Sequence, residues 1–436
     1  MTVGGRLRTL PIANYGWYDA DPAVQVDWAS VAGAPQPVRG QFAVHVENGD
    51  SHLLARDLLG VNKLFFTVRP DGELLSSNYL IDLVRTGVPI GDIWSVPSGH
   101  AVRVSLPHRS YELSCYASLE FNGEPADPAS IDAAAARIRQ ALSQAFSAFE
   151  RQTAGRPVYV TMSGGLDSST VALLARQRRA DVIGITFCIA DDAGRLMESE
   201  DLLHARRLAD ELGIPLRTVS ATPAQIIALL DDVLLYGQDW RDFNVHCGLV
   251  NAVIAKAIAA ETPAGTRPVV LTGDGMNELM SDYTAVRYAG REYYTLPDLG
   301  RARLRQFLVR GLDTGDREVG IYARYGIDVI QPYAICASAY LAVPAGLLEA
   351  SDAKERLVTA VMGEAVPAYI RQRPKVRAQA GGSEELRGTL TVLVDAGIDS
   401  EQLKQRFAAL MGCQQAELDR LIRAGVYRFT TQFLWN

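Results

Sequence analysis

Short apolar stretches separated by turn signals dominate the first 120 residues or so. The turns include Asn48-Gly49-Asp50 and Pro70-Asp71-Gly72, and apolar positions between them alternate or run continuously. Such spacing is typical of antiparallel strands joined by tight turns. We therefore predict a β-rich region whose strands include residues 41–46, 51–55, 63–68 and 101–104.

Beyond residue 130 the pattern changes to alternating strands and longer amphipathic helices. Ser130 is a candidate N-cap, and Ile138, Leu142 and Phe146 share one face of the helix that follows. Predicted strands at 158–162, 181–189, 216–220 and 269–272 alternate with helices at 169–178, 199–212, 224–236 and 248–260. This order predicts an α/β fold with a doubly wound parallel sheet covered by helices on both faces, followed by a mostly helical part from about residue 291.

A segment rich in proline and glycine at residues 122–128 separates the two patterns. We therefore expect two domains, at residues 1–122 and 123–436.

Composition and charge narrow the class of protein. Of the 436 residues, 48% are hydrophobic and 21% charged, which excludes wholesale disorder and fibrous classes. A net charge of −7 without a basic run disfavours nucleic-acid partners, although it permits a small anion bound locally. No run of 18 apolar residues and no secretory signal stand out, so we expect no membrane partner. Five scattered cysteines without a C-x-x-C pair argue against disulfides and structural zinc, and favour a cytoplasmic location.

One loop carries a specific chemical signal. An apolar strand ends in Ser163-Gly164-Gly165-Leu166-Asp167-Ser168-Ser169, and a helix is predicted to start at once. Glycines let backbone amides approach an anion, a helix N-terminus adds unpaired N–H groups, and Asp167 offers a hard oxygen for Mg²⁺. The loop therefore predicts a phosphate site at the carboxyl end of a strand, where open α/β sheets bind ligands. It matches neither a Walker loop nor a dinucleotide fingerprint.

A second turn, Thr272-Gly273-Asp274-Gly275, follows the strand predicted at 269–272. Because parallel strands end at the same edge of a sheet, we expect this turn to lie beside the loop at 163–169. Alone, such a turn is also ordinary turn chemistry.

The loop at 163–169 resembles the pyrophosphate loop (PP-loop) of the asparagine synthetase family of ATP-pyrophosphatases. Stretches resembling other elements of that family occur in order at residues 187–189, 198–206, 271–279 and 373–375. In the first domain, residues 55–66 and 96–100 resemble the family's glutaminase domain. The resemblance implies an N-terminal glutaminase-like αββα sandwich of the Ntn type and a C-terminal PP-loop synthetase domain.

Three departures from the family bear on function. Thr2 stands where glutamine-dependent members carry their catalytic cysteine, which implies a retained scaffold domain without glutaminase activity. Asn277 replaces an aspartate that helps to hold magnesium, but its carbonyl oxygen can still coordinate. Asp274 stands where the family's β-lactam synthetases place a catalytic tyrosine, which argues against closure of a β-lactam ring.

The resemblance also implies a set of site residues. Lys375, Asp274 and Glu318 are the catalytic candidates, and Lys375 would stabilise charge on the α-phosphorus and on pyrophosphate. Asp167 and Asn277 are the magnesium candidates. The ATP-binding candidates are Met162, Ser163, Gly164, Gly165, Asp167, Ser168, Ser169, Ile189, Thr272, Gly273 and Gly275. The acids at positions 198, 200, 201, 278 and 318 stay open as candidates for base catalysis, metal binding or binding of the substrate amine. The polar residues Asp239, Asp242, Asn244 and His246 stay open as candidates for substrate recognition.

These residues predict an ATP-dependent, AMP-forming ligase that adenylates a carboxylate and couples it to an amine, with ATP and Mg²⁺ as cofactors. Small-molecule carboxylates and amines are the expected partners, and a homodimer is left open. The alternatives are amidation with free ammonia, a non-catalytic scaffold that retains the fold, and a tRNA-modifying ATP-pyrophosphatase, which the acidic charge disfavours.

Overall fold

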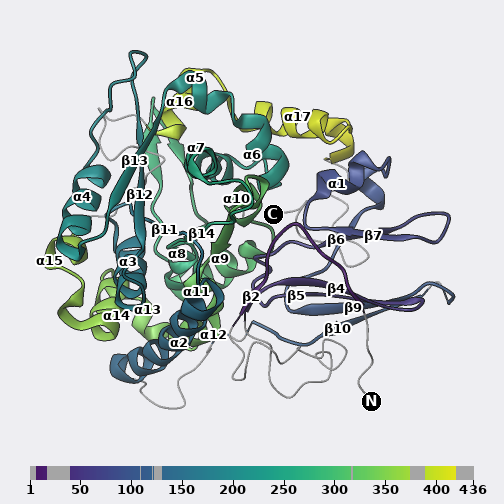
Figure 1. Cartoon of the computed structure of the whole chain (residues 1–436), viewed down its shortest axis with the longest axis horizontal. Coiled ribbons are helices and arrows are strands. Elements are labelled where there is room, and N and C mark those ends of the chain that lie inside the picture. The colour runs from purple at the N-terminus through teal and green to yellow at the C-terminus, as the bar shows by residue number, and fades with distance from the viewer. Residues whose placement is uncertain are drawn as a thin grey trace.

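The computed structural model of the chain describes residues 6–16, 40–108, 110–119, 121, 130–315, 318–373 and 388–418. Figure 1 shows a β-rich N-terminal unit lying beside a larger α/β unit. The domain boundary predicted between residues 122 and 123 falls at a segment, 122–129, that lies outside the described residues.

Two antiparallel sheets form the N-terminal unit. Five strands make the first sheet, in the order β1-β4-β5-β9-β10, and three make the second, in the order β7-β6-β8. Their bounds are β1 Arg6–Leu7, β4 Ala43–Asn48, β5 Ser51–Arg56, β6 Phe65–Val68, β7 Leu74–Ser77, β8 Trp94–Ser95, β9 His100–Ser105 and β10 Ser110–Cys115. A short ladder pairs β2 (Tyr15–Gly16) with β3 (Gly40–Gln41). The sequence therefore predicted the strand content of this unit well.

The two sheets pack face to face through a buried apolar layer. Leu54 and Val102 of the first sheet belong to the same cluster as Phe66 and Leu74 of the second. Within the described part of this unit, one α-helix, α1 (Leu80–Arg85), and one 3-10 turn, η2 (Ile90–Asp92), accompany the sheets. Two packed β layers are therefore present, but the αββα sandwich of the Ntn type that the resemblance implies is not confirmed, since its outer helical layers are not found among the residues described.

A parallel sheet lies at the centre of the α/β unit, as predicted, and it contains a fifth strand, β17, in addition to the four that were predicted. Its order is β13-β12-β11-β14-β17, and every neighbouring pair is parallel. The strands are β11 Val158–Thr161, β12 Ile183–Ile189, β13 Leu216–Ala221, β14 Val269–Leu271 and β17 Asp328–Ile330. The chain first adds strands on one side of β11 and then on the other. Such a reversal between β11 and β14 creates a crevice at their carboxyl ends, where ligands bind in open α/β sheets.

Helices cover both faces of this sheet. Figure 1 shows α3 (Leu166–Arg178) and α4 (Glu200–Leu212) on one side, and α7 (Asp242–Glu261) and α10 (Glu318–Arg324) on the other. The predicted cap at Ser130 is confirmed, because its hydroxyl accepts from Ala133 N at the start of α2 (Ile131–Gln152). The hydroxyl of Ser199, predicted as the first residue of a helix, accepts from Leu202 N and caps α4. The remaining helices before residue 300 are α5 Pro223–Ile227, α6 Leu230–Gly237 and α8 Met276–Met280.

The C-terminal part is mostly helical, as predicted. Its helices are α9 Arg301–Gly315, α11 Pro332–Ile335, α12 Ala337–Leu341, α13 Ala345–Leu348, α14 Ala353–Met362, η3 Gly363–Ala365, α15 Ala368–Arg371, α16 Thr389–Asp395 and α17 Ser400–Leu410. Three strands interrupt it that the sequence pattern did not predict: the hairpin of β15 (Val286–Tyr288) and β16 (Arg291–Tyr293), which starts just before residue 291, and β17.

Among the described helices, α7 is long and apolar enough to cross a membrane by length and composition, with a mean hydropathy of 1.4 in its most apolar window. However, 56% of that window is buried inside the protein. Core helices of soluble proteins pass the same test, so this feature is weak evidence for a membrane span.

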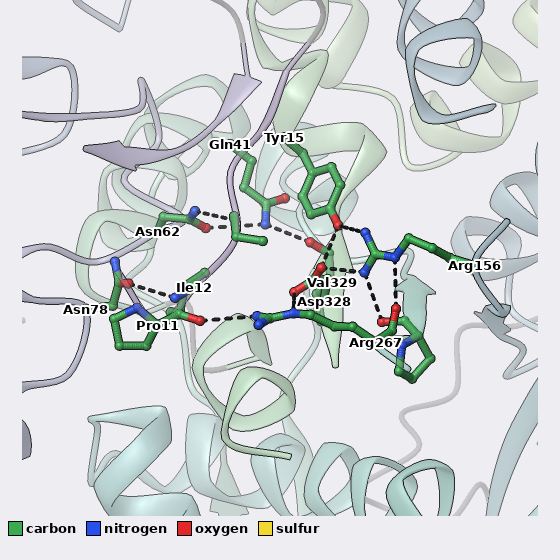
Figure 2. A network of polar contacts seen from close by, with 12 residues as sticks. Pro11, Ile12, Tyr15, Gln41, Asn62, Asn78, Arg156, Arg267, Asp328 and Val329 are labelled. Carbon is green, nitrogen blue, oxygen red and sulfur yellow. Dashed lines mark hydrogen bonds and ion pairs between the residues drawn. The ribbon is translucent and has the colours of Figure 1, made fainter. Parts of the chain in front are cut away.

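Polar contacts join the two units through a buried carboxylate (Figure 2). Asp328 is 4% exposed, and its oxygens accept from Tyr15 Oη at 2.7 Å and Arg267 Nε at 2.6 Å, and from the Arg156 guanidinium. The apolar core is also continuous, because the ring of Tyr79 packs edge-on at 5.2 Å from that of Tyr236. The two predicted domains therefore form one packed body.

Candidate functional site

The loop between β11 and α3 has the close approach that its glycines predict. Gly164 adopts a left-handed φ of +66°, and a Cβ on it would lie 2.4 Å from the Cβ of His204 in α4. The hydroxyls of Ser163 and Ser168 lie 3.0 Å apart and close the loop on itself. Gly165 is the N-cap residue of α3, and it has no side chain that could accept hydrogen bonds from the first N–H groups of the helix. Such an end is suited to an anion.

The turn after β14 packs directly against this loop, as expected from the parallel sheet. A Cβ on Gly273 would lie 2.8 Å from Ser168 N and 3.0 Å from the carbonyl carbon of Asp167. Any side chain at position 273 would therefore push the two loops apart. Gly275, two residues on, has a φ of +93° and begins α8.

Both loops line one cavity of about 380 Å³. The predicted residues in its wall are Met162, Ser163, Gly165, Asp167, Ser168, Thr272, Gly273, Asp274, Asn277 and Glu318. Four predicted residues do not line it: Gly164, Ser169, Ile189 and Gly275. Gly164 and Gly275 shape the two turns instead, and the wall at β12 is formed by Ile185, Thr186 and Phe187, with the carbonyl of Ile189 accepting from Met197 N.

Lys354 is the main feature of the site that sequence reasoning missed. From the second position of α14, its Nζ donates to Oδ2 of Asp167 at 2.7 Å, Oδ1 of Asn277 at 2.8 Å and Oδ2 of Asp282 at 3.0 Å. Burial by itself would lower the pKa of this ammonium, but the carboxylates of Asp167 and Asp282 outweigh it and the pKa is raised. Lys354 is therefore a fixed positive charge in the cavity wall.

One sequence signal could have drawn attention to Lys354. The chain holds 43 basic residues, of which five are lysines: Lys63, Lys256, Lys354, Lys375 and Lys404. In a chain so rich in arginine, a retained lysine suggests a position that needs a compact point charge rather than a planar fork.

A second cation, Arg373, brings the C-terminal segment to the loop. Its guanidinium donates to the carbonyl of Ser163 at 3.1 Å and to Oδ1 of Asp201 at 2.6 Å. Burial raises the pKa of Asp201, although Arg373 opposes that shift. Lys375, two residues further along, lies outside the described residues, so its catalytic role stays a prediction.

Glu318 lies across the cavity at the start of α10 and is only 2% exposed. Its Oε2 accepts from Thr272 Oγ1 at 3.0 Å and from Gln331 Nε2 at 2.7 Å. These neutral donors hold the carboxylate in place and leave it able to accept a proton. Of the five acids left open by the sequence, Asp201 and Glu318 line the cavity. Glu278 does not line it but accepts from the hydroxyl of Tyr283, which does.

The polar residues that the sequence suggested for substrate recognition lie elsewhere. Asp239, for example, is buried in an ion pair with Arg241 and accepts from Asn244 Nδ2 at 2.7 Å. None of Asp239, Asp242, Asn244 and His246 lines the cavity. Their neighbours on α7 do: Phe243, Cys247, Val250, Asn251 and Ile254. The apolar side of the cavity therefore comes from the helix that follows the polar stretch.

The oxygen donors fit a divalent cation. Oδ1 of Asp167 is buried and accepts no hydrogen bond from the described residues, so this carboxylate keeps an oxygen for a ligand. The neighbouring donors, Asn277 and Asp282, are hard oxygens of the kind that Mg²⁺ prefers. Lys354 already supplies one positive charge to these oxygens. A neutral asparagine at position 277, in place of the aspartate found in the family, is compatible with that nearby ammonium.

Part of the chain is similar to known proteins. Residues 137–317 match the asparagine synthase family. A carboxyethyl-arginine beta-lactam-synthase from Streptomyces clavuligerus is 26% identical over 257 residues, covering 55% of this chain and 45% of the relative. Amidase chyE from Penicillium rubens is 25% identical over 288 residues, covering 57% and 41%.

A shorter similarity links the chain to a tRNA-specific 2-thiouridylase, MnmA of Parvibaculum lavamentivorans, at 42% identity over 71 residues, or 14% of this chain and 18% of the relative. The chain spans under half the length of the relatives it matches. The stretch that matches the asparagine synthase family, residues 137–317, begins in α2 and includes both glycine-containing loops.

Proposed function

We propose that the protein is an ATP-dependent ligase that forms AMP and pyrophosphate while it joins a carboxylate to an amine. The observation that carries this proposal is the single cavity lined by the two glycine-containing loops, the ammonium of Lys354 and the carboxylate of Glu318. Such a site combines an anion cradle with a group that can take up a proton. The asparagine synthase domain at residues 137–317 supports the same reading.

The triphosphate of ATP would lie against the loop at 163–168, where N–H groups of α3 and the serine hydroxyls can donate to it. Lys354 and Arg373 would add positive charge where pyrophosphate departs. Asp167 and Asn277 would hold Mg²⁺, which when bound neutralises phosphate charge. The apolar wall of α7 leaves room for the less polar part of ATP or of the carboxylate substrate.

The reaction would proceed in two balanced steps. An oxygen of the substrate carboxylate attacks the α-phosphorus, and the bond to pyrophosphate breaks to give an acyl-adenylate. The amine nitrogen then attacks the acyl carbon, AMP leaves with the carboxylate oxygen, and the amine loses a proton. We assign that proton to Glu318, because its carboxylate lines the cavity and is oriented there by the hydroxyl of Thr272 and the amide of Gln331. Asp274, in the same wall, is the second candidate.

The amine would come from a second substrate rather than from glutamine. Position 2 holds threonine, whereas glutamine-dependent members of the family carry a cysteine there. One relative bears the name of a beta-lactam synthase, so amide formation without a glutamine-derived amine is compatible with this domain. Because Asp274 takes the tyrosine position of β-lactam synthetases, we propose coupling between two molecules rather than ring closure.

The test measures AMP and pyrophosphate from ATP with panels of carboxylates, each with amines, with ammonium or with glutamine. A carboxylate labelled with ¹⁸O should transfer one labelled oxygen to AMP, since that oxygen leaves with it. AMP formation with ammonium alone would favour amidation by free ammonia. Release of glutamate from glutamine would contradict the expectation that the N-terminal unit lacks glutaminase activity. No AMP with any combination would favour the scaffold alternative.

A further inference from the structure

A buried glutamine of the N-terminal unit pairs with the edge of the parallel sheet. Gln41 is fully buried at the end of β3. Its Nε2 donates to the carbonyl of Val329 at 2.9 Å, as Figure 2 shows, and its Oε1 accepts from Gln331 N at 3.1 Å. The carbonyl of Ile330, between them, instead accepts from Thr272 N on the opposite side. The Gln41 amide therefore fixes the backbone of β17 from the side away from β14.

Gln331, whose backbone is held in this way, also contacts a residue of the site. The backbone N–H of Gln331 is bonded to Gln41, and its side-chain Nε2 donates to Oε2 of Glu318 at 2.7 Å. Gln331 and Glu318 are each 2% exposed, so water has little access to replace either bond. A rotation or shift of Gln331 would therefore be felt directly by the carboxylate of Glu318.

The N-terminal unit also holds the helix that carries Glu318. The hydroxyl of Tyr79 donates to the carbonyl of Gly320 at 2.7 Å, two residues beyond Glu318 in α10. This contact is tight, since a Cβ on Gly320 would lie 2.2 Å from the carbonyl oxygen of Tyr236 and 3.3 Å from the Tyr79 ring. One unit thus touches both the helix bearing the carboxylate and the strand end bearing its hydrogen-bond donor.

We propose that Gln41 is a positioning residue that orients Glu318 through Gln331. This inference rests on the proposed function, in which Glu318 accepts a proton from the amine. It gives the N-terminal unit a role in the reaction that needs no nucleophile of its own. Tyr15, in the same interface, donates instead to the carboxylate of Asp328 in β17.

The test is a double-mutant cycle. Gln41→Met keeps a similar volume but removes the hydrogen bonds of the amide to Val329, Gln331 and Asn62. The kcat for amide formation should fall by roughly tenfold while the KM for ATP stays unchanged. In a Glu318→Gln background the same substitution should have almost no further effect on kcat. Tyr15→Phe, which removes a hydroxyl from the same interface, is the matched control and should leave kcat as in the wild type.

Equal loss of kcat in both backgrounds, or a raised KM with kcat unchanged, would overturn the proposal. If Gln41→Met does not melt cooperatively, Gln41→Leu takes its place, because it also removes the hydrogen bond to Gln331 N without introducing a charge. If the wild type makes no AMP at all, the proposed function fails and hydrogen exchange decides the positioning role. Residues 318–322 should then exchange faster in Gln41→Met than in the wild type, and unchanged exchange would refute it.

Discussion

The ammonium nitrogen of Lys354 lies 2.7 Å from Oδ2 of Asp167, so a helix near the C-terminal end is tied to the loop that begins α3. The same nitrogen reaches Oδ1 of Asn277, which follows β14. One cation of α14 therefore binds oxygens from two other parts of the sequence, at residue 167 and at residues 277–282. If the ammonium were absent, the partly buried carboxylates of Asp167 and Asp282 would lose the positive charge that both of them contact.

Removing that cation should affect both stability and turnover. Lys354→Met leaves the surrounding oxygens without their shared donor, so we expect unfolding to become easier by about 3 kcal/mol. AMP formation should fall by roughly 100-fold, because a fixed charge near departing pyrophosphate is lost. Urea denaturation and an AMP assay measure the two effects. Lys256→Met on the exposed side of α7 is the control, and wild-type behaviour of Lys354→Met would remove this residue from the site.

Replacing Glu318 should separate the two chemical steps. Glu318→Gln keeps an oxygen that accepts from Thr272 and Gln331, so the fold should be retained. We expect amide formation to fall by about 100-fold or more, as for loss of a general base. ATP–pyrophosphate exchange, which reports adenylation alone, should persist. Equal loss of both activities would instead place Glu318 in adenylation, and Glu278→Gln, outside the cavity, provides the comparison.

The contact between the two loops predicts an effect of a single methyl group. Gly273→Ala would place a Cβ 2.8 Å from Ser168 N, which forces the loops apart. We expect a loss of about 1–3 kcal/mol in stability, typical of overpacking, together with weaker ATP binding. Calorimetric titration with ATP measures the second effect. At Gly346 a Cβ meets nothing within 4 Å, so Gly346→Ala should bind ATP as the wild type does, and equal behaviour of both variants would contradict the packing argument.

The family resemblance makes its own prediction for Lys375. Arg373 donates to the carbonyl of Ser163 in the loop at 163–169, and Lys375 follows it by two positions in the sequence. Lys375→Ala should lower turnover by about 100-fold through lost stabilisation of phosphate charge, with unchanged thermal unfolding. Steady-state kinetics and a melting curve test this. Turnover at the wild-type rate would refute the assignment.

The buried imidazole of His246 predicts a pH dependence of stability. Burial lowers the pKa of His246 to about 3 from an ordinary 6.5, so the folded protein keeps it neutral where the unfolded chain takes up a proton. Stability from this group is therefore complete above pH 6.5 and is lost as the pH falls toward 3. The slope should be at most about 1.4 kcal/mol per pH unit. Urea midpoints between pH 7 and 4 should fall less steeply for His246→Gln, and identical slopes would contradict the assignment.

Much of the α/β unit could be predicted because its signals are local. The strand of 158–161, the serine and glycine loop and the helix after it are contiguous in sequence, and each element has the pattern that its environment requires. Ser130 and Ser199 marked helix starts for the same reason. Local signals also placed Thr272 and Gly273 beside the loop, since parallel strands share one edge.

Contacts between distant segments could not be read in this way. Lys354 lies 187 positions from Asp167, and nothing in its own amphipathic helix distinguishes it from a surface lysine. The strand β17 has three residues, too few for a periodic pattern, so Asp328 and Gln331 carried no visible role. Ile189 shows the converse, because it belongs to the expected strand yet contributes to packing rather than to the cavity wall.

The amide of Gln41 has a consequence for assembly. In the order β13-β12-β11-β14-β17 the last strand is an edge, and edges with open backbone groups invite pairing with another chain. Gln41 bonds the carbonyl of Val329 and the N–H of Gln331 much as one residue of a sixth parallel strand would. A side chain thereby terminates the sheet. A protein shortened to its α/β unit would expose the edge strand β17, and pairing of that edge with other chains would favour aggregation.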